Sequence, residues 1–271
     1  MKEMMNMTKC YISTILNGNK DYRIIKEVLK KADFPIGLEY FISALTDQKI
    51  KELQKLQTEI GDRPSTFHSP MVDCESTSEY DSEAYHKMIT NWKKTIEFCH
   101  QYGSTEIVFH TNNCTIKPEE RKEKQQNAIK NCLMLNQLCK ENNLKLLVET
   151  LALPSKGAPL FTDQEFVQFI LDYDLYALID IGHMNINNYD YSYVIKKLNH
   201  RILGYHIHNN NGLSDDHQRI GSGTFDYQRF YQLYKQYTPN ANLVIEYFNI
   251  PDFTSDELLA DILELLQGIK K

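Results

Sequence analysis

Short apolar runs alternate with longer amphipathic segments along the chain, and this pattern repeats eight times. The short runs predict buried strands, because a strand covered on both faces is apolar along most of its length. The longer segments carry apolar residues at three- and four-residue spacing, which predicts helices. The predicted strands cover residues 9–16, 36–42, 64–70, 105–112, 144–151, 175–185, 202–209 and 241–248.

The predicted helices lie between these strands, and three of them have clear sequence signals. Residues 129–139 form an apolar stripe at three- and four-residue spacing. Two other helices begin with a capping box, in which Thr is followed three residues later by Glu. These pairs are Thr162 with Glu165 and Thr254 with Glu257.

Eight strand–helix units in a chain of 271 residues predict a single (β/α)8 TIM barrel. The alternative is a doubly wound open sheet, which usually has fewer strands, and no GxGxxG motif follows the first strand here. The eight prolines all lie in turns or at strand ends, and no linker or shift in composition divides the chain. We therefore expect one domain covering residues 1–271.

Composition and charge narrow the class of protein. The net charge is −6, which counts against the broad basic surface of a nucleic-acid binder. Six scattered cysteines without a CxxC pair fit reduced thiols, and neither a signal peptide nor a membrane span is present. These features predict a cytoplasmic protein without a membrane partner, for which a homodimer is the default expectation.

Polar residues of the metal-ligand type occupy the ends of six predicted strands. In a TIM barrel these ends meet at one mouth, where active sites form. Buried carboxylates are costly unless they are paired or bind a metal, so a divalent cation is expected between them. Mixed nitrogen and oxygen ligands favour manganese or zinc, with cobalt and iron as further candidates. The residues are His68, His110, Glu149, Asp180, His208 and Glu246, with His183 three residues after Asp180.

Each residue alone has a simpler structural interpretation. A single His at a strand end is more often a hydrogen-bonded structural group than a metal ligand. Glu39 is a candidate substrate contact only, and Asp180 is also a candidate cap for the loop after it. Of the neighbouring histidines, we expect His208 to face the barrel interior and His206 to face the helices. His217 is a candidate plain loop residue.

Three segments together resemble the xylose isomerase-like TIM-barrel superfamily, which includes sugar-phosphate isomerases and epimerases and the endonuclease IV branch of AP endonucleases. They are IDIGHMN, HIHNNNGLSDDHQRIGSGTFD and VIEYF, and the resemblance covers essentially the whole chain. Similarity to the ketose 3-epimerase members implies one metal ion bound by Glu149, Asp180, His208 and Glu246. It also implies that the two glutamates move the proton and that His183 binds substrate.

Similarity to the endonuclease IV branch implies three zinc ions at the same mouth. The additional ligands would be His68, His110, His183, Asp215 and His217. The sequence departs from both groups: Ser155 and Ser214 replace an epimerase Glu and Arg, and the segment FISALTDQK lacks the Arg of the endonuclease DNA-binding loop.

Two hypotheses follow. In the first, the protein is a metal-dependent sugar or sugar-phosphate isomerase or epimerase, with Glu149 and Glu246 transferring protons alpha to a carbonyl of a small carbohydrate. Lys156 and Arg219 would then be candidate contacts for an acidic group of the substrate. In the second, it is a zinc-dependent phosphodiesterase of the endonuclease IV type, for which the additional ligands are needed. The sequence favours the first, because the acidic charge and the missing Arg argue against DNA.

Overall fold

Eight parallel strands form a closed barrel in a computed structural model of the protein, which describes residues 10–16, 22–151, 155 and 157–270. The strands pair in sequence order, and β1 closes the barrel against β8. The predicted (β/α)8 fold is therefore confirmed. The strands are β1 (Cys10–Ser13), β2 (Ile36–Phe41), β3 (Ser65–His68), β4 (Glu106–Phe109), β5 (Lys145–Glu149), β6 (Tyr176–Asp180), β7 (Ile202–Ile207) and β8 (Asn242–Ile245).

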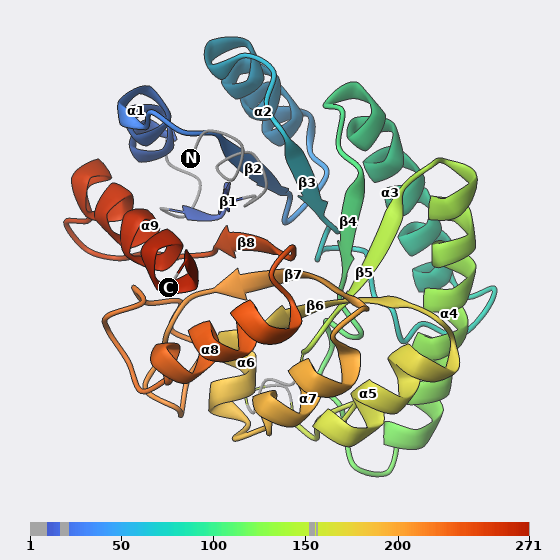
Figure 1. The fold of residues 1–271 in the computed structure, drawn as a ribbon. Coiled ribbons are helices and arrows are strands. Elements are labelled where there is room, and N and C mark those ends of the chain that lie inside the picture. Colours follow the sequence, from blue (N-terminus) through green and yellow to red (C-terminus); the bar gives the residue numbers. More distant parts are fainter. Residues whose placement is uncertain (1–9, 17–21, 152–154, 156, 271) are drawn as a thin grey trace.

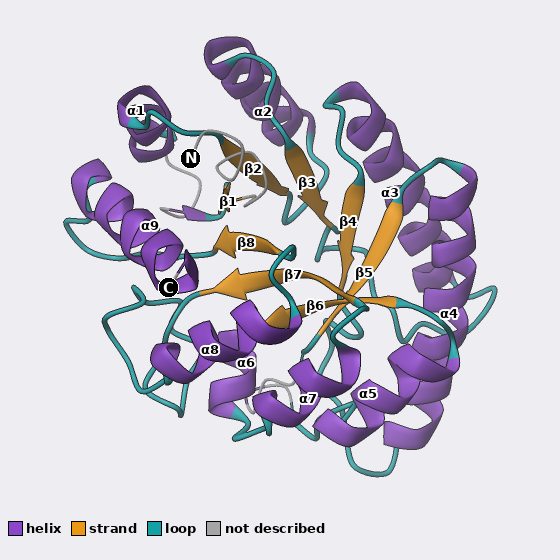
Figure 2. Ribbon diagram, viewed as in Figure 1, coloured by secondary structure: helices purple, strands orange, loops and turns teal. Residues whose placement is uncertain are grey.

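Helices surround the barrel as an outer ring (Figures 1 and 2). The first and last helices of the described chain pack against each other, which closes the ring where the barrel itself closes. The helices are α1 (Arg23–Lys31), α2 (Asp47–Ile60), α3 (Glu83–Gln101), α4 (Arg121–Glu141), α5 (Asp163–Asp172), α6 (Ile181–Ile186), α7 (Tyr191–Leu198), α8 (Tyr227–Tyr237) and α9 (Ser255–Lys270).

Local sequence signals explain where several helices begin. Thr162 and Glu165 form the expected capping box at the start of α5. Thr254 and Glu257 make the same reciprocal backbone contacts at the start of α9. Each box satisfies backbone N–H groups that have no partner inside the helix. Within the described residues, no helix is long and apolar enough to cross a membrane.

The sixth strand is shorter than predicted. It ends at Asp180, and residues 181–186 form the short helix α6 instead of continuing the strand. The Asp180 carboxylate accepts a hydrogen bond from the backbone N–H of His183, so it caps this helix. Helix α6 is also buried, so the apolar run continues from β6 into this helix. Periodicity alone cannot distinguish a short buried helix from a strand.

Two apolar clusters show which way the strand residues point. Most core residues lie in one large cluster, which includes Ile107 and Phe109 of β4. Val108, between them, belongs to a separate small cluster with Leu147 and Leu178. Because successive strand residues point to opposite faces, the small cluster lies inside the barrel and the large one lies between strands and helices.

Candidate metal centre

The predicted ligands lie directly above the inner apolar cluster. His110, Glu149 and Asp180 each follow a member of that cluster by two residues, so they point to the same inner face. All three are buried, although they are polar. The strand period and the common direction of parallel strands therefore bring these distant residues to one mouth of the barrel.

The Glu149 carboxylate is the centre of the cluster and has four imidazoles around it. Its Oε2 atom lies 2.8 Å from Nε2 of His110 and 3.6 Å from Nε2 of His68. Its Oε1 atom lies 3.4 Å from Nδ1 of both His183 and His206. One oxygen of this carboxylate thus faces His68 and His110, and the other faces His183 and His206.

The surrounding imidazoles keep the buried carboxyl groups ionised. Burial alone would raise the pKa of Glu149, but His110 and His206 hold it well below its usual range. Burial opposes ionisation of Asp180 in the same way, and His183 and His208 lower its pKa below the usual range. The cluster therefore contains buried negative charge, and the ionised state of these carboxyl groups depends on nearby positive charge.

His206 does not face the helices, so that prediction is wrong. Its neighbours Tyr205 and Ile207 belong to the large outer core, which places His206 inside the barrel. Nδ1 of His206 lies 3.2 Å from Glu246 Oε2 in addition to its contact with Glu149. Residues two apart in a strand share a face, so His206 and His208 both point inward.

His208 follows β7 directly and is also buried. Its Nε2 lies 3.0 and 3.1 Å from the two carboxylate oxygens of Asp180. The ring stacks on His217, with ring centroids 3.9 Å apart. Its remaining nitrogen, Nδ1, is buried without a hydrogen-bond partner. The structure therefore places both His206 and His208 in the site.

Asp215 and His217 reach the site from the loop between β7 and α8. Nε2 of His217 lies 3.2 Å from Asp215 Oδ2, and Nε2 of His183 lies 3.5 Å from the same oxygen. Burial alone would lower the pKa of His217, but Asp215 raises it to about 9. Asp215, His183 and His217 thus form a further ligand group beside the one around Glu149.

Five histidines share one arrangement of their two ring nitrogens. One nitrogen is held by a backbone carbonyl or a side-chain oxygen, and the other faces a different carboxylate of the cluster. This is the usual state of a metal-ligating His, whose second N–H is fixed by an outer partner. The outer partners are the carbonyl of Ser69 for His68, the Asn113 side chain for His110, the carbonyl of Thr150 for His183, the Glu39 side chain for His206 and the carbonyl of Glu246 for His217.

The potential ligand atoms divide into overlapping groups of three, each with its atoms within 4.8 Å of one another. Every predicted metal ligand belongs to at least one group, and Glu149 and Glu246 belong to two each. The groups are His68, His110 and Glu149; His183, Asp215 and His217; His208, His217 and Glu246; Glu39, His206 and Glu246; and Glu149, Asp180 and His206.

Gly182 leaves the space that the His208 ring occupies. A Cβ at this position would lie 1.9 Å from Cε1 of His208, whose ring also stacks on His217. We expect Gly182→Ala to displace the ring, to weaken metal binding at least tenfold and to destabilise the fold by about 1–3 kcal/mol. Urea unfolding and metal competition would measure both effects.

Gly221→Ala is the matched control for this prediction. A Cβ at Gly221 would meet no atom within 4 Å, so this variant should behave like the wild type. Wild-type metal affinity in Gly182→Ala would show that the position of the His208 ring is unimportant for the site.

Arg219 is paired with residues of α9, and its expected role as a substrate contact stays a prediction. Its guanidinium makes two hydrogen bonds to the Asp261 carboxylate and one to Glu257, both on α9. It also lies over the ring of Phe253. Arg219 therefore ties the β7–α8 loop to α9 through charge-assisted hydrogen bonds. The other expected contact, Lys156, lies outside the described residues.

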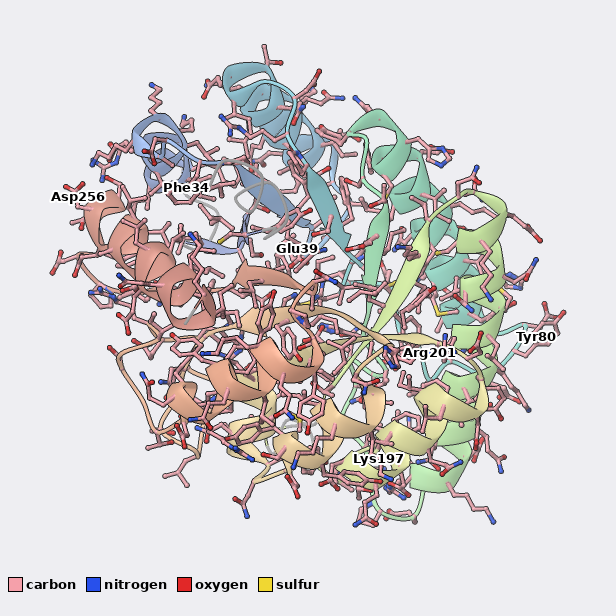
Figure 3. The ribbon with its side chains drawn as sticks, viewed as in Figure 1. Phe34, Glu39, Tyr80, Lys197, Arg201 and Asp256 are labelled. Carbon is pink, nitrogen blue, oxygen red and sulfur yellow. The ribbon has the colours of Figure 1, made fainter. Side chains whose placement is uncertain are left out.

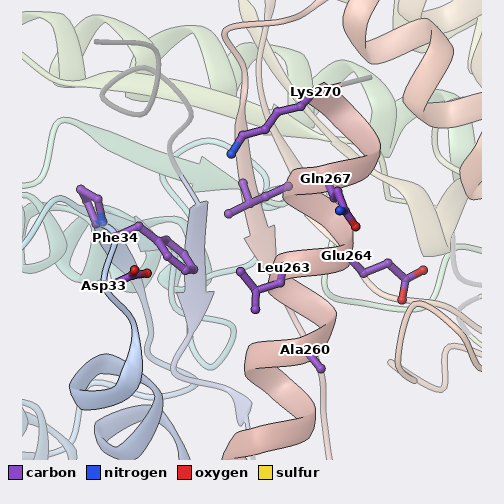
Figure 4. Close-up of a pocket in the computed structure, with 9 residues that line it drawn as sticks. Asp33, Phe34, Ala260, Leu263, Glu264, Gln267 and Lys270 are labelled. Carbon is purple, nitrogen blue, oxygen red and sulfur yellow. The ribbon is translucent and has the colours of Figure 1, made fainter. Parts of the chain in front are cut away.

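A small cavity of about 110 Å³ opens above the cluster. Ligand-type residues form one side, and apolar side chains of Ile15, Phe41, Met71 and Leu151 form the other. A larger cavity of about 620 Å³ lies between α9 and residues 33–35, which precede β2 and so lie at the opposite end of the barrel (Figure 4). We assign the site to the smaller cavity, because it holds the convergent buried polar groups.

Two inward-facing residues were not predicted as ligands. His206 contacts the cluster directly, and Glu39 lies beneath it on β2, near the middle of the barrel (Figure 3). Counting by two from His208 would have placed His206 on the inner face. In β2, the apolar residues at every second position mark the outer face. Glu39 lies between two of them, so the same period of two would have identified it as an inward-facing carboxylate.

The chain belongs to the xylose isomerase-like TIM barrel family, whose model matches residues 18–269. An uncharacterized protein of Methanocaldococcus jannaschii is 24% identical over 96% of this chain and 98% of its own length. A D-tagatose 3-epimerase-like protein has a similar structure, with a TM-score of 0.76 and 20% identity over 97% of this chain and 98% of that one. An AP endonuclease, family 2, from Brucella melitensis has a TM-score of 0.72 and 16% identity over 95% and 98% of the two chains.

Proposed function

We propose that this protein is a metal-dependent sugar or sugar-phosphate isomerase or epimerase. The observation that carries the proposal is the convergence of two glutamates from different strands. Glu149 and Glu246 lie 3.4 and 3.2 Å from the same atom, Nδ1 of His206, below the cavity at the mouth. The similar structures of sugar epimerases support the same class of reaction.

The residues present fit a divalent metal ion. Three buried ligand-type atoms have no hydrogen-bond partner within the described chain, and an unpaired buried polar atom is costly. Mixed imidazole and carboxylate donors suit manganese or zinc, and also cobalt or iron. We propose Glu149, Asp180, His208 and Glu246 as the principal ligands. The unpaired atoms are His206 Nδ1, His208 Nδ1 and Asp215 Oδ1.

A bound divalent ion would supply Lewis-acid polarisation of a substrate carbonyl and its neighbouring hydroxyl. Glu149, which is ionised, would accept the proton alpha to that carbonyl. Glu246, on the other side of the site, would return a proton to the substrate. Nδ1–H of His183 is held by the carbonyl of Thr150, so its Nε2 remains available for a substrate oxygen.

Exchange of the alpha hydrogen with solvent tests this proposal. Ketoses and their phosphates would be incubated with the metal-loaded protein in heavy water. We expect deuterium at the carbon next to the carbonyl, together with formation of the isomer or epimer. Absence of exchange with a broad substrate panel would contradict proton transfer of this kind.

A second candidate function is metal-dependent phosphodiester hydrolysis. The observation in its favour is that two ligand groups contain residues for which the first proposal has no role, namely His68, His110, Asp215 and His217. One contains His68 and His110, and the other contains His183, Asp215 and His217. Two or three ions held by these groups could clamp both oxygens of an in-line displacement.

Asp215→Ala tests whether the outer ligand group holds an ion of its own. Since Asp215 is the carboxylate of that group, we expect the variant to lose about one zinc ion per chain. The ligand group around Glu149 should still bind its zinc ion. Mass-spectrometric metal analysis of the two proteins would measure this difference, and cleavage of abasic-site DNA would test the hydrolase function directly. A wild-type protein with one ion per chain would contradict the multi-metal site.

The remaining properties are proposed on less specific grounds. The closed barrel involves all eight strands, so we propose that the chain acts as one domain. The small mouth cavity suits a small carbohydrate better than a nucleic acid, and the net charge of −6 argues in the same direction. We further propose a cytoplasmic enzyme that forms homodimers.

A further inference from the structure

We propose that Nδ1 of His206 is itself a ligand of the metal ion bound by Glu149, Asp180 and Glu246. Glu39 is then the positioning residue that fixes the His206 ring from below. This inference rests on the proposed metal centre. It adds one imidazole ligand to the four principal ligands and one carboxylate that positions this imidazole. It also explains why both residues are completely buried inside the barrel.

The contact between Glu39 and His206 determines which ring nitrogen carries the proton. Glu39 Oε1 accepts a hydrogen bond from Nε2–H of His206 at 3.0 Å. Its other oxygen accepts from the Thr66 hydroxyl at 3.2 Å. Since both oxygens act as acceptors, the neutral ring has its proton on Nε2 and its lone pair on Nδ1.

The lone pair of Nδ1 points into a group of negative oxygens. This nitrogen lies 3.2 Å from Glu246 Oε2, 3.4 Å from Glu149 Oε1 and 3.6 Å from Asp180 Oδ2. It is buried and has no hydrogen-bond partner within the described chain. Electron-rich atoms gathered in this way repel one another unless a cation lies between them.

The distances match those between ligands of one ion. Zinc binds nitrogen and oxygen at about 2.0–2.2 Å, so two of its ligand atoms are about 3.0–3.6 Å apart in tetrahedral or octahedral geometry. All three distances from Nδ1 fall in that range. Glu149, Asp180 and His206 also form one group whose ligand atoms all lie within 4.8 Å of one another, so these three residues can share one ion, with Glu246 beside Nδ1.

The outer partner of His206 differs from those of three other histidines in the cluster. His68, His183 and His217 are each held by a backbone carbonyl, whereas His206 is held by a carboxylate. A carboxylate partner makes the ligating nitrogen more basic and orients the ring more firmly. Glu39 therefore strengthens the bond between His206 and the metal ion.

The test uses Mn²⁺ alone as the probe and the complete chain. Electron spin-echo modulation detects imidazole nitrogens bound directly to Mn²⁺, and competition with a chelator gives the dissociation constant. We expect His206→Gln to lose one nitrogen coupling and to bind Mn²⁺ at least tenfold more weakly. We expect Glu39→Gln to weaken binding by about 10- to 100-fold.

Two control variants make the same chemical changes elsewhere. His100→Gln alters an exposed His at the end of α3, and this His contacts the carbonyl of Asn142. Glu106→Gln alters another buried carboxylate of the barrel, which accepts a hydrogen bond from the Asn242 side chain on β8. Both should bind Mn²⁺ within twofold of the wild type.

Each outcome separates this inference from the proposed function. Unchanged affinity and nitrogen coupling in His206→Gln, with loss of coupling in His208→Gln, would overturn the inference and leave the metal enzyme intact. If His206→Gln does not fold, wild-type affinity in Glu39→Gln would overturn the positioning role. Loss of nitrogen coupling in His206→Gln, with no deuterium exchange in the wild type, would support the inference and reject the isomerase.

Discussion

Glu149→Gln is expected to abolish isomerisation, lowering kcat by about 10³-fold or more. Glu149 is both the proposed base and the carboxylate at the centre of the imidazole cluster, with contacts to His110 and His206. The amide has no ionised oxygen to accept a proton, and it is a poorer metal ligand. Exchange of the substrate alpha hydrogen with heavy water would measure the loss directly.

The control is the same substitution at an exposed position. Glu141→Gln alters an exposed carboxylate at the end of α4 that accepts a hydrogen bond from Gln137, so the activity of this variant should be unchanged. Exchange at the wild-type rate in Glu149→Gln would exclude this residue as the base. A variant that still binds metal but does not exchange hydrogen would separate the proton-transfer role from the ligand role.

Removal of bound metal is expected to lower stability as well as activity. A ligand that binds only the folded state stabilises it by about 2.7 kcal/mol at a free concentration 100 times its dissociation constant. For a chain of this size, that gain corresponds to a rise in the midpoint of thermal unfolding of about 5 °C or more. Scanning calorimetry of chelator-treated protein, before and after addition of Mn²⁺ or Zn²⁺, would measure the shift.

The rise in the thermal unfolding midpoint on metal binding should depend on pH and on the type of ion. An imidazole must lose its proton to bind a metal, so affinity should rise with pH. Asp215 raises the pKa of His217 to about 9 in spite of burial, and competition from protons should therefore extend above neutral pH. Mg²⁺, which prefers oxygen ligands, should give a smaller shift. Identical unfolding with and without Mn²⁺ or Zn²⁺ would contradict a structural contribution of the metal.

The sequence was sufficient for the architecture because the physical signals were local. Apolar runs of strand length, amphipathic segments and capping boxes such as Thr162 with Glu165 depend on neighbouring residues. The polar residues at strand ends were equally informative, since all parallel strands of a barrel end at one mouth. Glu149, Asp180 and His208 were assigned to that mouth on this basis, and they lie there.

The roles of some residues depended on contacts that only the folded chain forms. Arg219 was expected at the substrate, and the sequence did not indicate that Asp261 and Glu257, more than 35 residues further along the chain, bind its guanidinium. No local pattern reports such a pairing. The end of β6 was also misjudged, because a buried helix such as α6 continues the apolar run of the strand before it.

The sequence by itself determined the barrel, the mouth and the kinds of ligand that gather there. The tertiary structure decided which groups meet: Glu149 between His110 and His206, and Glu39 beneath His206. Strand periodicity fixes the face on which a side chain lies. Only closure of the barrel brings β2, β5, β7 and β8 to the same few ångströms, and the proposed metal chemistry depends on those distances.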